Sequence, residues 1–389
     1  MPTTTTSRST RPDWMTDDLE AVRDLAATYF GKEVLTRADE HRAQGHASRE
    51  AYLKAGELGL VGMSLPEEYG GGGASFAAEA VLLEEQVRTG DTSMGFAVSI
   101  GIVAHYLAAY ATDEQKQRWL PKVCSGEWVL SIAMTEPGTG SDLQAIKTRA
   151  VKDGDDYVIN GAKTFISNGH LCNLLVIAAK TGDEDGAAGI SLIVAEVDDD
   201  TPGFTRGRVL AKMGQKDQDT AELAFEDLRV PQANLLGPKE GHGFYQMMEQ
   251  LPQERLITAI LAQAQIEKSV ELTVAYTKER HAFGKPLMAL QNTRFELAEC
   301  ETISRVNRAF LDQCIEKHID GGLDATEASM AKYWISDRAT EVADRCLQLF
   351  GGYGYMDEYP ISRIYTDVRV LRILAGANEV MKELIARSL

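Results

Sequence analysis

The 389-residue chain carries 58 acidic and 40 basic residues, giving a formal net charge of −18, and 44% of its residues are hydrophobic. This is the composition of a soluble globular protein that is long enough for two or three structural units. The acidic balance offers no broad basic surface to a phosphate backbone, which argues against nucleic acid as a partner.

The cysteines and the start of the chain give no sign of a metal centre, a membrane span or secretion. The five cysteines are scattered and form no Cys-x-x-Cys pair, a pattern typical of core thiols in a reducing compartment. No apolar run is long enough to span a membrane, and the first residues lack the apolar segment of a secretory signal. We expect residues 1–12 to form a disordered tail. We expect a cytoplasmic protein, or one in the mitochondrial matrix if the source is eukaryotic.

Residues 13–128 are expected to form a helical N-terminal domain. Apolar residues recur at spacings of three to four in segments such as 80–83 and 102–107, the pattern of amphipathic helices. Asp113 is predicted to be the N-cap of a helix that runs toward Trp119. The run Gly70–Gly73 lacks the Lys-Ser/Thr of a phosphate loop, so we interpret it as a flexible turn.

Residues 129–240 are expected to form a middle β domain. Short β-rich runs follow one another here: Val129–Ile132, Tyr157–Ile159, Thr164–Ile166, Leu174–Ala178, Ile190–Val194 and Ala221–Phe225. Asn160-Gly161 separates two of these runs and predicts a two-residue hairpin turn. The acidic segment Thr181–Gly189 is expected to be an exposed loop.

Residues 241–389 are expected to form a C-terminal helical bundle. Helical periodicity runs over residues 255–278, over about 294–317, from Met330 to Phe350, and again from near Asn378. Four such helices predict a four-helix bundle. The apolar stripes are interpreted as core; they include Phe295, Val306 and Phe310 on the second helix and Trp334 on the third.

Three stretches carry groups suited to ligand binding. Residues 133–142 leave a strand for a loop of glycines and hydroxyls that could present N–H groups to a ligand, although ordinary turns share this composition. Residues 348–355 contain paired glycines but follow a helix, so they are no dinucleotide fingerprint and could be a helix C-cap. Arg280, in the stretch 279–286, is either a phosphate ligand or a charge at a helix C-terminus.

In this order and at these intervals, the three stretches resemble the acyl-CoA dehydrogenase flavoprotein family. Gln348-x-x-Gly351-Gly352-x-Gly354-Tyr355-x-x-Glu358 is similar to the second family signature. The segment from Met134-Thr135-Glu136 to Gly140-Ser141-Asp142 is similar to the first, with Thr139 where a smaller residue is usual. The likeness covers nearly the whole chain and is closest to the long-chain branch, notably at residues 251–255, 213–223 and 378–387.

The resemblance implies an α+β fold with a helical N-terminal domain, a β-barrel-like middle domain and a C-terminal four-helix bundle. It also implies FAD held between these domains and a homotetramer. The cofactor-binding residues that it implies are Met134, Thr135, Ser141, Phe165, Ile166, Ser167, Arg280, Phe283, Gln291, Gln348, Gly351, Gly352, Asn378 and Glu379. Among these, Arg280, Phe283, Gln291 and the residues from Gln348 to Gly352 would reach FAD from a neighbouring subunit. The substrate would contact Ser141, Arg255 and Gly376.

The implied reaction is α,β-dehydrogenation of an acyl-CoA thioester to the trans-2-enoyl-CoA, with hydride transfer to flavin N5. Many family members place the carboxylate base at the position that is Ala375 here. The long-chain and isovaleryl branches instead place a Glu before an Arg on the first long bundle helix, a pattern that Glu254-Arg255 matches. We therefore expect Glu254 to be the base and the backbone N–H of Ala375 to bind the thioester oxygen. Arg255 either tunes Glu254 or forms a structural ion pair.

Several alternatives stay open on the sequence. The thioester could be carried by an acyl carrier protein, the reduced flavin could react with O₂ as in an oxidase, or the chain could be a silent flavin-binding subunit, as Ala375 suggests. The resemblance implies an electron-transfer flavoprotein as acceptor. Small residues at Gly95, Ala97, Gly101 and Ala104 leave room for medium-to-long acyl chains or serve close helix packing.

Overall fold

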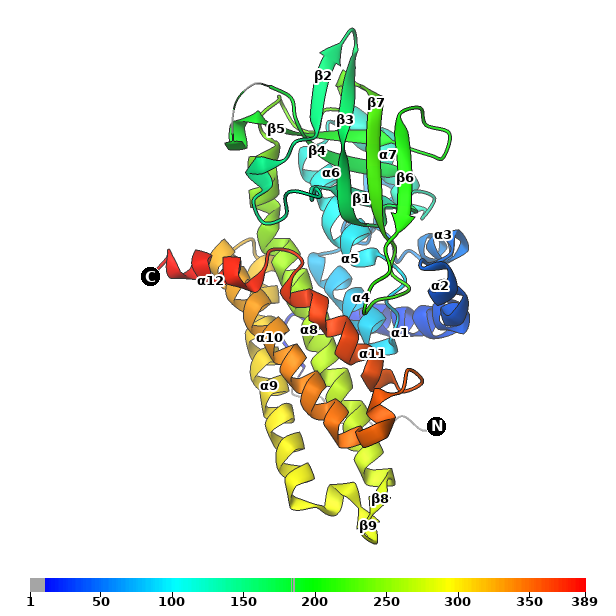
Figure 1. Cartoon of the computed structure of the whole chain (residues 1–389), viewed down its shortest axis with the longest axis vertical. Helices are drawn as coiled ribbons and strands as arrows, with labels where there is room; N and C mark the ends of the chain where they lie inside the picture. Colours follow the sequence, from blue (N-terminus) through cyan, green and yellow to red (C-terminus); the bar gives the residue numbers. More distant parts are fainter. Residues whose placement is uncertain (1–10, 183, 185) are drawn as a thin grey trace.

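The computed structural model describes residues 11–182, 184 and 186–389. The main β-sheet lies at one end of an elongated molecule, and three long helices run away from it, with the N-terminal helices packed beside both (Figure 1). The tail predicted over residues 1–12 lies outside the described residues except for Arg11 and Pro12. Arg11 is paired with Asp17 at 2.7 Å between Nη1 and Oδ1.

The N-terminal part is helical, as predicted. Its helices are α1 (Asp17–Tyr29), α2 (Ala38–Gln44), α3 (Arg49–Glu57), α4 (Phe76–Thr89), α5 (Phe96–Val98), α6 (Ala104–Tyr110) and α7 (Asp113–Cys124). The predicted N-cap Asp113 is wrong by one residue. Thr112 caps α7, because its hydroxyl accepts from the Gln115 N–H while the Gln115 side chain accepts from the Thr112 N–H.

The glycine run before α4 is a turn that backbone hydrogen bonds hold in place. The N–H groups of Gly72 and Gly73 donate to the carbonyls of Gly62 and Leu65 at 3.1 and 2.9 Å. A Cβ at Gly71 would lie 2.2 Å from the Leu65 carbonyl oxygen, so the backbones approach closely here. The expectation of a flexible turn is corrected by these contacts.

The middle part is a curled, mixed seven-stranded sheet in the order β1-β4-β2-β3-β7-β6, with β5 pairing β4. The strands are β1 (Leu130–Ala133), β2 (Arg149–Asp153), β3 (Asp156–Ser167), β4 (Leu174–Lys180), β5 (Ile190–Glu196), β6 (Phe204–Val209) and β7 (Thr220–Pro231). Two of them, β2 and β6, were not predicted from the sequence. Residues 183 and 185 of the predicted acidic loop lie outside the described residues.

The hairpin predicted at Asn160-Gly161 is wrong. Both residues lie inside β3, where the register with β7 shifts between Ile159 and Gly161. A Cβ at Gly161 would lie 2.4 Å from the Thr148 hydroxyl, so this glycine serves close packing at a bulge. The hairpin instead joins β2 to β3, where Asp153 pairs with Asp156 and Gly154 has φ of 62°.

The C-terminal part contains the helices α8 (Gly243–Glu279), α9 (Gln291–Ile319), α10 (Ala325–Phe350), α11 (Pro360–Asp367) and α12 (Asn378–Ala386). A hairpin of β8 (His281–Ala282) and β9 (Lys285–Pro286) joins α8 to α9. Helix α8 begins at Gly243, earlier than predicted, and continues through Pro252. The predicted fourth helix begins at Asn378, as expected, and is α12. Helix α11 and the 3₁₀ turn that precede it were not predicted.

The apolar stripes of α9 and α10 are only partly core. Phe295 and Val306 are 57% and 60% exposed, and Trp334 is 41% exposed. The interpretation of these three residues as core is therefore wrong for the single chain. Leu297, Cys300, Leu311 and Cys314 fill the core side of α9 instead. Helix periodicity identifies an apolar stripe but does not say whether this chain or another covers it.

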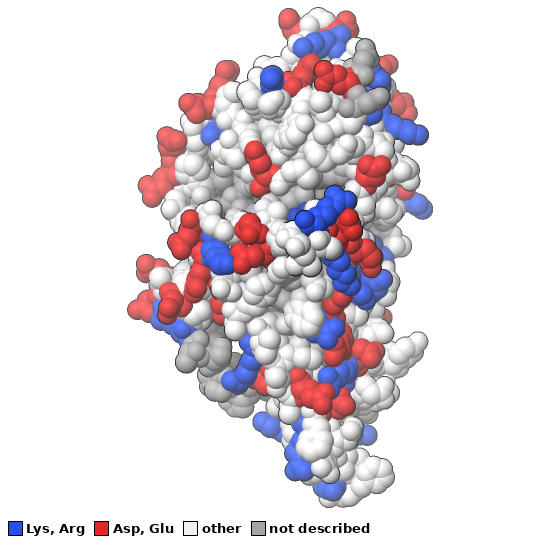
Figure 2. Space-filling view, turned by 90° about the vertical axis from the view of Figure 1, so that its left-hand side faces the viewer, with Lys and Arg blue, Asp and Glu red and all other residues white. Residues whose placement is uncertain are grey.

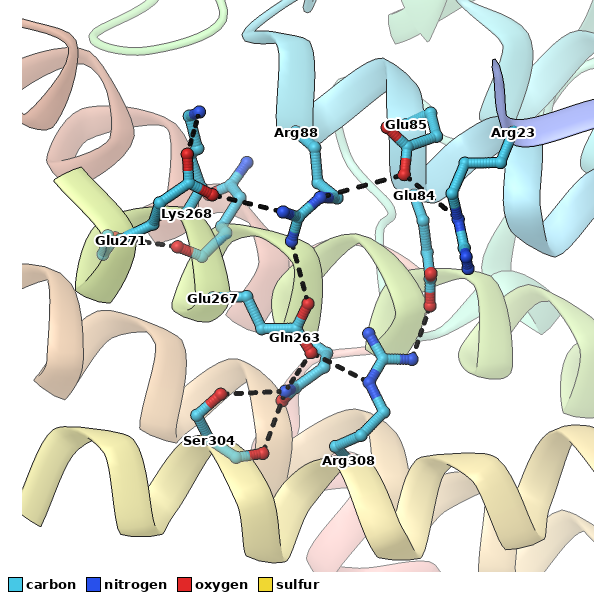
Figure 3. Close-up of polar contacts among 12 residues, drawn as sticks. Arg23, Glu84, Glu85, Arg88, Gln263, Glu267, Lys268, Glu271, Ser304 and Arg308 are labelled. Atoms are coloured by element: carbon cyan, nitrogen blue, oxygen red, sulfur yellow. Dashed lines mark hydrogen bonds and ion pairs between the residues drawn. The ribbon is translucent and has the colours of Figure 1, made fainter. Parts of the chain in front are cut away.

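Ion pairs tie α4 to α8 and α9 (Figure 3). Arg308 of α9 pairs with Glu84 of α4 and, at 2.9 Å, with Glu267 of α8. Arg88 of α4 reaches Glu267 and Glu271, each at 3.1 Å. Each carboxylate of this α4–α8–α9 network lies against an arginine, which offsets the cost of removing the charges from water.

The distribution of charged side chains on the surface agrees with the expectation, drawn from the net charge, that no broad basic patch is present. Acidic and basic side chains are interspersed over the described part of the face in Figure 2, and no broad basic patch occurs there. Within the described residues, no helix combines the length and the apolar character that crossing a membrane requires. The five cysteines are buried and unpaired, as expected.

Candidate active site

A cavity of about 240 Å³ lies where the three parts of the chain meet. Its walls come from the end of α4 and the segment to Ile102, from β1 and β3, from α8, and from the loop before α12. Seven predicted site residues line it: Met134, Thr135, Phe165, Ile166, Ser167, Glu254 and Ala375. Segments that are far apart in the sequence therefore contribute to one half-open cavity.

A buried ion pair holds the segment after β1, which carries Met134 and Thr135. The Lys163 ammonium donates to the Met134 carbonyl and to Glu136, each at 2.9 Å. Glu136 also accepts from the Thr148 N–H at 2.9 Å. Burial lowers the pKa of Lys163 to about 8, although the Glu136 charge opposes this shift. The sequence offered no signal for Lys163, because a lysine in a strand is usually a solvated residue.

Three residues lining the cavity have left-handed backbone. Phe165, Gln215 and Ala375 have φ of 60°, 45° and 51°. This region of φ/ψ space costs energy for residues with a Cβ, and such strain concentrates at functional sites. Phe165 is also 68% exposed, which is unusual for a phenylalanine next to a core. The strained backbone of these three residues therefore indicates that the cavity is a functional site.

Glu254 is a buried carboxylate, and no cation among the described residues forms an ion pair with it. It is 7% exposed, and its Oε1 accepts a 2.8 Å hydrogen bond from the Tyr106 hydroxyl. Burial raises the pKa of Glu254 to about 7, while the Tyr106 hydrogen bond and the Arg255 charge oppose the shift. Tyr106 was missed by sequence reasoning, because it lies 148 residues from Glu254 in the chain and sits in an ordinary helical stripe.

Arg255 points away from the cavity. Its Nη1 donates to the Ser329 hydroxyl of α10 at 3.1 Å, and no ion pair joins it to Glu254 in the described contacts. Its Nε is buried without a hydrogen bond among the described residues. Of the two readings left open, a local ion pair is not present, and Arg255 acts on Glu254 only through its charge.

Hydrogen bonds from Lys332 of α10 hold the loop that carries Ala375. The fully buried Lys332 ammonium donates to the Gly376 carbonyl at 2.6 Å and to Asn378 Oδ1 at 2.8 Å. Asn378 in turn donates to Asp337 at 2.9 Å. Asn378 and the Gly376 carbonyl are therefore occupied by α10, while the peptide of Ala375 borders the cavity. Burial lowers the pKa of Lys332 to about 8, and Arg255 adds to this shift.

The other predicted cofactor residues do not reach this cavity. Arg280, Phe283, Gln291, Gln348, Gly351 and Gly352 are exposed at the far end of the bundle, where the Arg280 guanidinium lies 5.5 Å from the centre of the Tyr353 ring. Along α8, the 26 residues from Glu254 to Arg280 span roughly 39 Å. This is too far for one flavin nucleotide to touch both groups within one chain. Ser141 and Glu379 are also exposed and lie outside the cavity lining.

The small residues around 95–104 have divided roles. Gly95 and Ala97 line the cavity, together with Val98 and Ile102. Gly101 instead allows close packing, because a Cβ there would lie 2.9 Å from Ile257 Cδ1. Gly95 serves both purposes, because a Cβ there would lie 1.7 Å from Asn168 Oδ1. Both explanations that the sequence left open therefore apply.

The cavity suits a flat ring with polar edges. Met134, Phe165 and Ile132 supply apolar surface, and the hydroxyls of Thr135 and Ser167 supply hydrogen-bonding groups beside them. This donor set fits the isoalloxazine of FAD.

Comparison with known proteins gives the same result across the chain. The family models for the N-terminal, middle and C-terminal domains of acyl-CoA dehydrogenase match residues 16–127, 131–228 and 241–389. The mitochondrial long-chain specific acyl-CoA dehydrogenase of Mus musculus is 46% identical over 94% of this chain and 85% of its own length.

Solved structures agree with these matches. An acyl-CoA dehydrogenase from Geobacillus kaustophilus has a TM-score of 0.94 at 46% identity, covering 97% of this chain and 99% of that one. A glutaryl-CoA dehydrogenase from Mycobacterium smegmatis, solved in complex with FADH2, has a TM-score of 0.88 at 25% identity, covering 96% and 94%. The predicted α+β fold and the family resemblance are confirmed. The chain therefore belongs to the acyl-CoA dehydrogenase family of FAD-dependent oxidoreductases, and FAD is its cofactor.

Proposed function

We propose that this protein dehydrogenates an acyl-CoA thioester between Cα and Cβ, forming the trans-2-enoyl-CoA, with Glu254 as the base that takes the α proton. The observation that carries the proposal is a carboxylate that is buried, lacks a cationic partner and shares one cavity with the Ala375 peptide. A general base is most effective when its pKa lies near the working pH, and the pKa of Glu254 is about 7.

Glu254 receives the α proton, and the Tyr106 hydroxyl stays as its hydrogen-bond donor throughout. That hydrogen bond fixes the direction of the carboxylate, leaving the second oxygen for the substrate. An aligned base contributes about 10²–10⁴ to the rate of such a proton transfer. When bound, FAD supplies the acceptor for the hydrogen that leaves Cβ with its electron pair.

The Ala375 N–H is the proposed donor to the thioester oxygen, on which negative charge grows as the α proton leaves. A fixed donor of this kind is typically worth about 10²–10³ in rate. Lys332 is the group that keeps the donor fixed, because it holds the carbonyl of the next residue, Gly376, at 2.6 Å. The loss of a side-chain carboxylate at Ala375 leaves this backbone role intact.

The cofactor ring would be held by Met134, Thr135 and residues 165–167. The exposed group around Arg280 and Phe283 would bind the FAD of a neighbouring subunit, since it lies too far from the cavity of its own chain. The exposed Phe295, Val306 and Trp334 support the homotetramer, because a second chain would cover them. An electron-transfer flavoprotein remains the proposed electron acceptor.

The test compares two glutamates of α8 that each accept a tyrosine hydrogen bond. Glu254→Gln should keep FAD but reduce the rate of anaerobic flavin bleaching by acyl-CoA by about 10²–10⁴. Glu249, bonded to the Tyr110 hydroxyl at 2.7 Å but exposed outside the cavity, gives the matched control. Glu249→Gln should bleach at the normal rate.

Near-normal bleaching in Glu254→Gln would remove Glu254 from the base role. No bleaching in the unaltered protein with any straight or branched acyl-CoA would support a silent flavin-binding subunit instead. Rapid peroxide formation without an added acceptor would support an oxidase.

A further inference from the structure

The stripe of α8 that lines the cavity continues well beyond the proposed base. Glu254, Thr258, Leu261 and Gln265 follow one another at spacings of three and four residues, and all four line the cavity. The eleven residues from Glu254 to Gln265 place the Gln265 backbone roughly 16 Å along the helix axis. The cavity thus has a reaction end and a distal end.

The distal end is closed by the end of α4. Gln86 and Val87 of α4 line the cavity together with Gln265. The two helices are side by side at this level, as the contacts of Arg88 with Glu267 and Glu271 in Figure 3 show. Two amide side chains on facing helices therefore border the part of the cavity farthest from Glu254.

Both amides have unused hydrogen-bonding groups. Gln265 is 4% exposed, its Oε1 is buried without a partner, and no hydrogen bond of its side chain occurs among the described residues. Gln86 donates from Nε2 to Asp91 at 2.9 Å and to the Met94 carbonyl at 2.6 Å. Within the described residues, the Gln86 side-chain oxygen has no donor.

A buried amide oxygen without a donor is costly, and a hydrocarbon chain beside it would leave the cost in place. A hydroxyl group removes it, because a hydroxyl both donates and accepts. Its O–H can donate to the Gln265 Oε1, the buried oxygen that has no partner among the described residues. The remaining lining nearby, Val87, Val98 and Leu261, suits the methylene groups that lead to it.

We infer that the distal end of the cavity binds a hydroxyl group on the acyl chain, so that this enzyme prefers long-chain acyl thioesters hydroxylated near the terminal carbon. This inference rests on the proposed function, since it takes Glu254 to mark the thioester end. An extended chain advances about 1.2 Å per bond, so the distance along α8 corresponds to a hydroxyl roughly ten to fifteen carbons from the carbonyl.

The test uses the FAD-loaded enzyme and pairs of straight acyl-CoAs with 8 to 16 carbons, one plain and one with a terminal hydroxyl. The measured quantity is the ratio of kcat/KM for the hydroxylated chain to that for the plain chain. We expect this ratio to peak at one length between about 10 and 16 carbons. In Gln265→Met the peak should fall about five- to tenfold, because a volume-conserving side chain cannot bond the hydroxyl.

Gln263→Met is the matched control. Gln263 is a buried amide on the same helix, and its Oε1 also lacks a partner among the described residues, but its Nε2 donates to the Ser304 carbonyl at 2.9 Å and it does not line the cavity. The control should keep the unaltered ratio at every length. A second readout separates an amide without any side-chain hydrogen bond from one whose Nε2 is bonded: Gln265→Met should raise the Tm of the ligand-free holoenzyme, and Gln263→Met should lower it.

A ratio that shows no peak, or the same peak in Gln265→Met, would overturn the inference, as would a lower Tm in Gln265→Met. If no plain acyl-CoA of any length reduces the flavin, the proposed function fails instead. In that case the affinities of the enzyme for the same acyl-CoA pairs are measured by calorimetry, which tests the distal end of the cavity by itself. Equal affinities for the plain and the hydroxylated chain in every pair would overturn the inference.

Discussion

Helix α8 carries a half-buried glutamate, Glu267, and a buried one, Glu254, in opposite electrostatic settings. Glu267 lies in the α4–α8–α9 network, where the charges of Arg308 and Arg88 outweigh burial and hold its pKa below the usual value. Glu254, thirteen residues earlier, has a tyrosine hydroxyl in place of an arginine, and burial raises its pKa to about 7. The paired carboxylate is suited to joining helices, and the carboxylate without a cation is suited to moving a proton.

The largest expected effect comes from breaking the paired region. Arg308→Met would leave Glu84 and Glu267 buried beside an apolar side chain, and breaking such a network costs about 3–5 kcal/mol. We expect a large drop in the denaturant midpoint of the FAD-loaded protein. Arg305→Met is the control, because Arg305 forms an exposed ion pair with Glu301, one turn away on α9. Equal effects of the two substitutions would show that the network contributes no more than a surface pair.

The unpaired region should respond in the opposite direction and in a pH-dependent way. The pKa of Glu254 is higher in the folded chain than in the unfolded chain, so its ionisation destabilises the fold. That penalty is absent below about pH 4.5 and complete above about pH 7. Glu254→Gln should therefore stabilise the protein by roughly 3 kcal/mol at pH 8 and by little at pH 5.

The measurement is the unfolding free energy of the FAD-loaded, substrate-free protein at both pH values. Glu249→Gln, the exposed control, should show no such difference between them. A Glu254→Gln effect that is independent of pH would mean that the carboxyl titrates in its ordinary range.

The smallest effect concerns the hydrogen bond from Tyr106. Because this bond lowers the pKa of Glu254, Tyr106→Phe should raise that pKa further. The ascending limb of kcat/KM against pH, with its midpoint near 7 in the unaltered protein, should shift upward by about one unit. Tyr110→Phe, which removes the bond to Glu249, should leave the midpoint in place. A downward shift in Tyr106→Phe would contradict the assigned direction.

Sequence patterns predicted well which regions form helices and which form strands, and predicted less well where each helix or strand begins and ends. Helical and β-rich regions follow periodicity, which is local. The errors arose where contacts between distant segments decide the outcome. Asn160-Gly161 has the composition of a hairpin turn, but Thr148 packs against Gly161 inside a bulged strand. Phe295 and Trp334 have core-like spacing, but the described residues leave them 57% and 41% exposed.

The sequence by itself determined the family, the candidate base and its unusual position, because Glu254-Arg255 and Ala375 are visible as letters in a recognisable order. Only the tertiary structure decided that Glu254 is buried against Tyr106, that Lys332 holds the Ala375 loop, and that Gln86 and Gln265 share the far end of one cavity. Each of these facts depends on helices and strands that are distant in sequence being packed together. Burial and pairing set a pKa or leave an amide unsatisfied, and neither is encoded in a local pattern.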